Sequence, residues 1–237
     1  MSYVMGFVTP VSADNKQAYI DFANQTVAYF KDLGAVRLVE AWGEDVSKGK
    51  MTDFYKAVNA EDGEAIVYAF QMFPDKATAD AAGEKMMNDP AMADMGDKMP
   101  FDGARMIYAG FQTLADLRAE GQSGFIDGSV LAVPTASKAE YAASIETYFD
   151  LFKEHGAVRL VEAWGDNVPD GKVTDFKRAV AAKPDETVVM SWIEWPSREV
   201  RDLAWEKLYA DPRMQQAEAT YDESRRIYGG FVPVLDA

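Results

Sequence analysis

The spacing of hydrophobic and polar positions predicts one order of elements that occurs twice along the chain. Runs of apolar, β-branched and aromatic residues predict strands, and apolar positions that recur every three to four residues predict helices. Each half has the order strand, helix, strand, strand, helix, strand. The predicted strands are residues 3–11, 36–42, 65–73 and 106–114, followed by 125–133, 158–164, 187–195 and 226–235. The predicted helices begin near residues 14 and 137 and end before residues 34 and 156, with a second pair at residues 75–88 and 197–210.

Signals at the helix ends support this assignment. Gly34 and Gly156 stand where a left-handed cap commonly ends a helix. Ser137, with Glu140 three residues later, fits a capping box at the start of the first helix of the second half. We therefore expect the same long helix in both halves.

The ten letters GAVRLVEAWG stand at residues 34–43 and again at residues 156–165. Their alternation is typical of a strand, because successive side chains of a strand point to opposite faces. One face carries Val36, Leu38, Glu40 and Trp42, and the other carries Arg37, Val39 and Ala41.

The identity extends well beyond these ten letters. With a shift of 122 residues, residues 34–58 align with residues 156–180 and are identical at 18 of 25 positions. The shift falls to 120 near the end, because IYAGF at residues 107–111 matches IYGGF at residues 227–231. A long period that occurs only twice indicates a domain duplication and not a solenoid.

This order of elements predicts an α+β fold made of two ferredoxin-like (βαββαβ) repeats. Such a repeat leaves one apolar sheet face uncovered, so we expect the two repeats to pack sheet-to-sheet as an internal pseudo-dimeric α/β barrel. The expected domains are residues 1–116 and 124–237, joined by a linker at residues 117–123.

Composition narrows the expected partners. The 237 residues include 24 Lys and Arg against 39 Asp and Glu, a net charge of −15 at pH 7. This field repels phosphate backbones and anionic lipid, so we expect neither nucleic acid nor a membrane as a partner. The sequence shows no apolar run of about 18 residues and no basic leader, which predicts a cytoplasmic protein. Further oligomerisation stays open.

The motifs GFV-x-PV, GA-x-R-x-VE-x-WG and MPFDG-x-RMIY-x-GF resemble those of the YbaA-like bacterial proteins of unknown function. The resemblance covers nearly the whole chain, twice. It implies the fold of the dimeric α/β-barrel superfamily, with this chain as a fused pseudo-dimer of a family normally found as a homodimer. It implies no settled reaction. The second copy departs from the motif in its last loop, where ATYDESRRIY at residues 219–228 lacks the Pro and the Gly.

A set of polar and aromatic residues recurs in both copies and forms the candidate binding site. It consists of Arg37, Glu40, Trp42, Asp53, Asp102 and Arg105 in the first copy, and Arg159, Glu162, Trp164, Asp175, Asp222 and Arg225 in the second. Glu40 and Glu162 share a strand face with apolar residues, and a buried carboxyl needs a partner or a raised pKa. They are either ligand anchors and proton acceptors in a pocket, or members of a structural Arg/Glu network that fixes how strands or halves meet.

Other chemistry finds less support. Asp53 either caps the turn before the third strand or accepts a bond from Arg105, and capping is the more common role. GEDVSKGK and GDNVPDGK lack the spacing of a P-loop. The chain has no cysteine and a single histidine, His155, which excludes a catalytic triad in both halves and any two-histidine metal site. We expect no metal and no cofactor.

Three functions remain open. The first is small-molecule binding without chemistry, in one pocket per half. The second is a cofactor-independent, monooxygenase-like or isomerase-like enzyme that acts on a small aromatic or carbonyl substrate, which rests on analogy of fold. The third is an acidic protein-interaction module.

Overall fold

The structure is a computed structural model that describes residues 1–96, 98–215 and 220–237. The first half contains β1 (Tyr3–Ser12), α1 (Lys16–Asp32), β2 (Arg37–Asp45), α2 (Phe54–Ala57), β3 (Glu64–Phe73), α3 (Lys76–Asn88), α4 (Pro90–Gly96) and β4 (Ile107–Arg118). The second contains β5 (Phe125–Pro134), α5 (Lys138–Glu154), β6 (Arg159–Asn167), α6 (Phe176–Ala179), β7 (Glu186–Trp195), α7 (Arg198–Ala210), α8 (Pro212–Gln215) and β8 (Ile227–Asp236). Short 3-10 helices cover Ala13–Asn15, Thr135–Ser137 and Glu223–Arg225.

The predicted strands and long helices are confirmed, with ends that differ by a few residues. The helices α1 and α5 are both 17 residues long, and α3 and α7 are both 13. Strand β4 continues to Arg118, so it overlaps the first residues of the expected linker. The pattern did not predict α2 and α6, which are only four residues long and too short to show a helical period.

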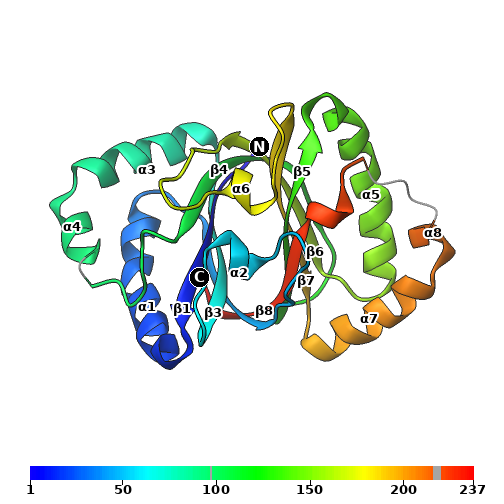
Figure 1. Cartoon of the computed structure of the whole chain (residues 1–237), viewed down its shortest axis with the longest axis horizontal. Coiled ribbons are helices and arrows are strands. Elements are labelled where there is room, and N and C mark those ends of the chain that lie inside the picture. Colours follow the sequence, from blue (N-terminus) through cyan, green and yellow to red (C-terminus); the bar gives the residue numbers. More distant parts are fainter. Residues whose placement is uncertain (97, 216–219) are drawn as a thin grey trace.

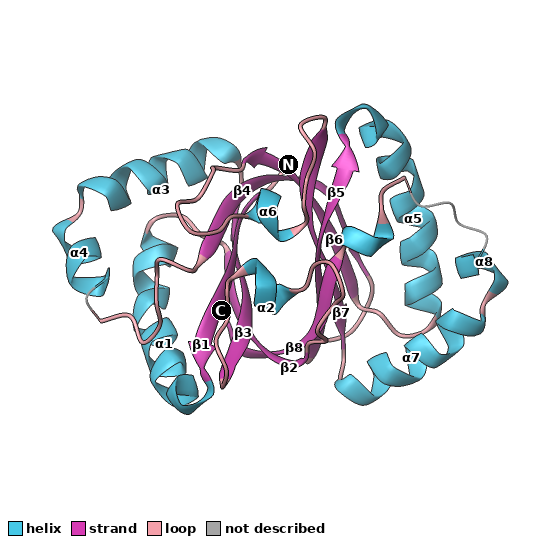
Figure 2. Ribbon diagram, viewed as in Figure 1, coloured by secondary structure: helices cyan, strands magenta, loops and turns pink. Residues whose placement is uncertain are grey.

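The eight strands form one closed antiparallel barrel in the order β1-β3-β2-β8-β5-β7-β6-β4. This confirms the α+β class and the barrel. The hydropathy pattern carried no information on what closes the barrel. The closure comes from two ladders between the halves, β2 with β8 and β4 with β6, so the outer strands of each half find partners in the other. In Figures 1 and 2 the long helices of each half cover opposite sides of this barrel.

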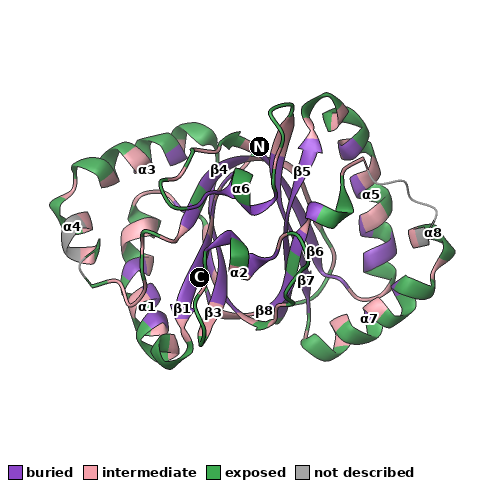
Figure 3. Ribbon diagram, viewed as in Figure 1, coloured by how far each residue is buried: buried purple, intermediate pink, exposed green. Residues whose placement is uncertain are grey.

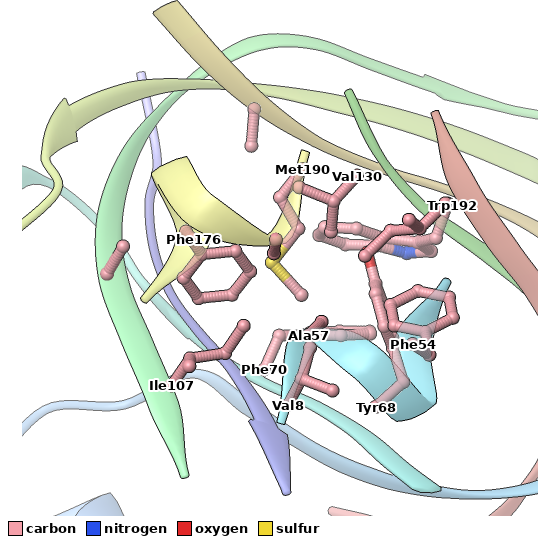
Figure 4. Close-up of a cluster of buried hydrophobic side chains, with 14 of the residues drawn as sticks. Val8, Phe54, Ala57, Tyr68, Phe70, Ile107, Val130, Phe176, Met190 and Trp192 are labelled. Atoms are coloured by element: carbon pink, nitrogen blue, oxygen red, sulfur yellow. The ribbon is translucent and has the colours of Figure 1, made fainter. Parts of the chain in front are cut away.

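Apolar side chains fill the barrel interior. Phe70 of β3 and Trp192 of β7 stack at its centre, with ring centroids 4.0 Å apart. Phe54 of α2 and Phe176 of α6 reach the same cluster, as Figure 4 shows, and α2 and α6 contact each other. The two short helices therefore complete the core, and the purple strands of Figure 3 mark how far the barrel is buried.

The predicted alternation in the duplicated strands is confirmed. Val39 and Ala41 belong to the cluster inside the barrel, whereas Leu38 and Trp42 pack in clusters with residues of α1. Glu40 lies on the same side as Leu38 and Trp42, where it accepts a hydrogen bond from Tyr19 of α1. The face that carries this carboxyl is therefore the outer face of the barrel, under the helices.

The glycine caps are confirmed, and the capping box is wrong. Gly34 and Gly156 have φ of +100° and +101°, in the left-handed region that glycine adopts without steric cost. The Ser137 side chain makes no capping hydrogen bond. The chain enters α5 directly from the 3-10 turn Thr135–Ser137, which gives Ser137 a ψ of 7° and not the extended backbone that a serine cap needs.

Within the described parts of the chain, none of the helices combines the length and the apolar composition that a bilayer crossing requires.

Candidate functional site

Glu162 of β6 lies under α5 on the outer face of the barrel, and its carboxyl is almost fully buried, with 8% of the residue exposed. The Tyr141 hydroxyl donates a hydrogen bond to Oε2 at 2.7 Å, and the Ser191 hydroxyl donates one to Oε1 at 2.6 Å. Burial raises the pKa of Glu162 to about 7, although both hydrogen bonds act in the opposite direction. A carboxyl with this pKa exists in both protonation states near neutral pH.

Glu40 occupies the equivalent place in the first half, with fewer partners. The Tyr19 hydroxyl donates a hydrogen bond to Oε2 at 2.5 Å, and burial again raises the pKa of the carboxyl to about 7. Ala69 stands opposite Glu40 in the strand register, where Ser191 stands opposite Glu162. The two glutamates therefore share a position and a titration range but not the same donors.

A cavity of about 670 Å³ lies beside Glu162, between the outer face of the barrel and helices α5 and α7. Its size is within the range of ligand sites for small molecules. Its wall combines aromatic side chains with polar and charged groups that come from several elements. The lining includes Asp127, Ser129, Tyr141, Ser144, Tyr148, Phe152, Glu162, Ser191, Arg201, Trp205, Glu223 and Arg226.

One wall of this cavity is held by Asp127 of β5. Its carboxylate accepts hydrogen bonds from the Trp195 and Trp205 indoles at 2.9 and 2.7 Å, and from Arg201 Nε at 2.7 Å. Arg201 Nη1 also donates to Asp45 of the first half at 2.7 Å. These bonds fix the aromatic wall and tie it to the other half of the barrel.

Arg226, between Arg225 and β8, also lines the cavity. The side chain is 27% exposed, yet its Nε is buried and has no hydrogen-bond partner among the described residues. Nη1 lies 3.6 Å from Glu223 Oε1, an ion pair without a hydrogen bond. Among the described residues, the Nε donor of Arg226 is therefore left without an acceptor.

The predicted tryptophans lie near the glutamates without lining this cavity. Trp42 packs against Tyr19 and Trp164 against Tyr141, each with ring centroids 6.3 Å apart. Trp164 is 6% exposed and is not among the residues around the cavity. Both indoles belong to the helix-covered core.

The predicted arginines Arg37 and Arg159 lie on the other strand face, away from Glu40 and Glu162. Arg37 donates to both oxygens of Glu194 at 2.6 and 3.0 Å, and to both oxygens of Asp236. Arg159 donates to both oxygens of Asp116 and reaches Glu194 at 3.4 Å. The arginine of each half thus pairs with a carboxylate of the other half, beside the barrel core.

The predicted loop residues form two equivalent structural clusters. Arg105 pairs with Glu64 and Asp102, and Arg225 pairs with Glu186 and Asp222. Asp53 accepts a hydrogen bond from the Lys56 amide at 2.7 Å, as Asp175 does from the Arg178 amide at 2.8 Å, and each begins a short helix. Of the two roles considered for Asp53, the structure has the cap.

In residues 1–96, 98–215 and 220–237, no group of three or more His, Asp or Glu side chains is placed to hold a metal ion. Sequence reasoning brought Glu162 to the site but missed Tyr141, Ser191, Asp127, Arg201 and Arg226. At most of these positions the two copies have different residues, and that difference was the signal by which the sequence could have identified them. Ser191, Asp127, Arg201 and Arg226 align with Ala69, Met5, Ala79 and Met106.

Comparison with known proteins identifies relatives without a known activity. A family model described as a protein of unknown function, DUF1428, matches residues 2–103 and 124–223. The uncharacterised protein YbaA of Escherichia coli K12 is 50% identical over 116 residues, which are 49% of this chain and 99% of the E. coli protein. The YbaA protein of Shigella flexneri matches equally well.

Solved structures share the fold at low sequence identity. A proposed monooxygenase from Fusobacterium nucleatum superposes with a TM-score of 0.60 at 10% identity, over 99% of this chain and 93% of that one. An anthrone oxidase-like protein gives 0.59 at 13% identity, over 100% and 92%. At these identities the likeness shows the fold alone. The two family matches and the repeated elements together show that this chain belongs to the DUF1428 family of proteins of unknown function and carries two YbaA-like copies in tandem.

Proposed function

We propose that this protein binds a small molecule in the cavity of its second half. The observation that carries the proposal is the cavity itself, about 670 Å³ in volume, with the Glu162 carboxyl held at its wall by Tyr141 and Ser191. Aromatic side chains together with oriented polar groups are features of small-molecule sites.

Binding is tested by thermal unfolding of the whole chain with a panel of aromatic carboxylates, amides and alcohols. A ligand that binds only the folded state raises the free energy of unfolding by RT ln(1 + [L]/Kd), and the melting temperature rises with it. We expect the stabilisation to fall in Glu162→Gln and to persist in Glu40→Gln, the matched change in the first half. A panel without any stabilising compound would refute the proposal, as would equal loss in both variants.

The raised pKa of Glu162 favours a second candidate, a cofactor-independent enzyme. A carboxyl with a pKa of about 7 is suited to accept a proton at neutral pH, since a general base works best when its pKa is near the working pH. Glu162 would remove a proton from an acidic C–H or O–H group of a small aromatic or carbonyl substrate. The fold shared with a proposed monooxygenase and an anthrone oxidase-like protein is in keeping with this reading.

The enzyme reading is tested by oxygen uptake and by exchange of substrate hydrogen for deuterium, with phenols and aromatic ketones. Glu162→Gln should abolish either reaction while leaving some binding. Reaction at the wild-type rate in this variant would exclude Glu162 as the base.

We also propose that residues 1–116 and 124–237 are two ferredoxin-like units joined at residues 117–123. The strand order β4-β1-β3-β2 of the first half recurs as β8-β5-β7-β6 in the second, which supports this division. A cytoplasmic location and further oligomerisation stay predictions.

A further inference from the structure

We propose that the cavity of the second half selects a small aromatic carboxylate, and that Arg226 is the residue that pairs with its charge. The inference rests on the proposed binding function and adds the class of ligand. It starts from the unequal pairing of Arg201 and Arg226, which line this cavity, and of Arg225, which precedes Arg226 in the chain.

Two of these arginines already have their partners. Arg201 donates to Asp127, Asp45 and Asp202 at 2.7 to 2.8 Å. Arg225 donates to both oxygens of Glu186 at 2.6 Å, to Asp222 and to the Ala181 carbonyl. Neither guanidinium has its charge available for a ligand.

Arg226 is not paired in this way. Its buried Nε has no hydrogen-bond partner in the part of the chain that the structure describes, and its nearest carboxylate oxygen, on Glu223, lies at 3.6 Å. A buried donor without an acceptor is unfavourable. A carboxylate in the cavity would pair with the terminal nitrogens Nη1 and Nη2, which make no hydrogen bond among the described residues and belong to a side chain that is 27% exposed. A guanidinium favours this planar pairing.

Glu162 also favours an anionic ligand. At and below neutral pH the raised pKa keeps much of this carboxyl protonated, so that it can donate a hydrogen bond to an anion instead of repelling it. The aromatic part of the ligand has partners in Phe152 and Trp205, whose ring centroids are 5.8 Å apart, and in Tyr148, which stacks on Phe152. A flat apolar body with one carboxylate fits these groups.

The first half lacks the equivalent of this site. Met106 aligns with Arg226, and Ala69 with Ser191. Phe7 and Phe22 stand where the second half has Ser129 and Ser144, which line the cavity. Phe22 packs edge-on against Phe101, which also contacts Tyr19, so aromatic rings fill the space beside Glu40. We therefore expect one anion site per chain.

The test is calorimetric titration of the whole chain with 2-naphthoate and with 2-naphthamide, which has a similar shape and no charge. We expect the carboxylate to bind at least about tenfold more tightly than the amide, with one site per chain. Arg226→Met, which places the first-half residue at this position, should remove that preference, and Arg226→Lys should restore part of it. Arg198→Met, at an exposed arginine of α7, makes the same change in net charge and should leave the preference unchanged.

Equal affinity for the two compounds in the wild type would overturn the assignment of an anion, while small-molecule binding would stand. A full preference for the carboxylate in Arg226→Met, with the fold intact by circular dichroism, would overturn the role of Arg226. Two sites of equal affinity would contradict the difference between the halves. If neither these compounds nor the neutral panel bind, the proposed function itself fails, and this inference fails with it.

Discussion

Replacing Glu162 with Gln should change how the stability of the protein depends on pH. The substitution keeps the size and planarity of the side chain and removes its titration. Below pH 4.5 the carboxyl is neutral in both the folded and the unfolded chain, so it makes no pH-dependent difference there. Between pH 4.5 and about 7 it ionises in the unfolded chain while the folded chain keeps its proton, so wild-type stability should fall as pH rises through this window.

The size of the effect follows from the two pKa values. A pKa of about 7 in the folded protein, against an ordinary value of 4.5, corresponds to about 3 kcal/mol at roughly 1.4 kcal/mol per pH unit. The amide of the variant cannot ionise, so the free energy of unfolding of Glu162→Gln minus that of the wild type should rise by about this amount from pH 4.5 to pH 8. Glu40 titrates in both proteins and cancels in the difference.

The assay is chemical denaturation monitored by circular dichroism at five or six pH values between 4.5 and 8. Glu140→Gln serves as the control, because Glu140 is an exposed residue of the same helix that covers Glu162. A difference between Glu162→Gln and wild type that stays constant across this range would refute the reasoning. It would mean that water reaches the carboxyl or that Tyr141 and Ser191 stabilise its charge fully.

Three further predictions concern the barrel and its helices. Glu194→Met introduces the residue that the first half has at the equivalent position, Met72, and should lower the free energy of unfolding by about 2 to 3 kcal/mol in urea titrations. The reason is that Arg37, Arg159 and Trp192 all lose an acceptor, while each arginine keeps one aspartate. A loss under about 1 kcal/mol would mean that the aspartates are sufficient partners for the two arginines. Gly34→Ala should lower the melting temperature by more than Gly63→Ala. Both residues have positive φ, but only at Gly34 would the new Cβ contact another atom, Thr78 Cγ2 at 2.7 Å. Equal losses would show that the backbone conformation alone sets the loss of melting temperature. Residues 1–122 and 123–237 produced as separate chains should copurify in equal amounts, because β2, β4, β6 and β8 complete each other's ladders; a stable monomer of either piece would contradict this.

The sequence was sufficient for the order of the strands and the long helices, because alternation in strands and a period of three to four in helices follow directly from backbone geometry. It placed Glu40 with Leu38 and Trp42 correctly. Which side of the strand the helices cover, and which edges pair between halves, depend on contacts far apart in the chain. The pattern therefore left open whether the glutamates face the barrel core or the helices.

The candidate site was predicted only in part for a similar reason. The alternation placed Arg37 and Glu40 on opposite faces but did not show that Arg37 would pair with Glu194 and Asp236 of the other half. Ser191 meets Glu162 because the two are directly paired between β6 and β7, a register that hydropathy does not give. Arg226 and Asp127 are not repeated in the first copy, so a comparison of the residues that the two copies share does not identify them.

The joining of two copies in one chain has a consequence for how this barrel can change. In a barrel of two identical chains, every substitution occurs twice, so a change that opens a cavity on one side also removes packing on the other. Here Ser129 and Ser144 line a cavity in one half while Phe7 and Phe22 keep their bulk in the other. The fused chain can keep one half as the scaffold while the other half acquires new side chains.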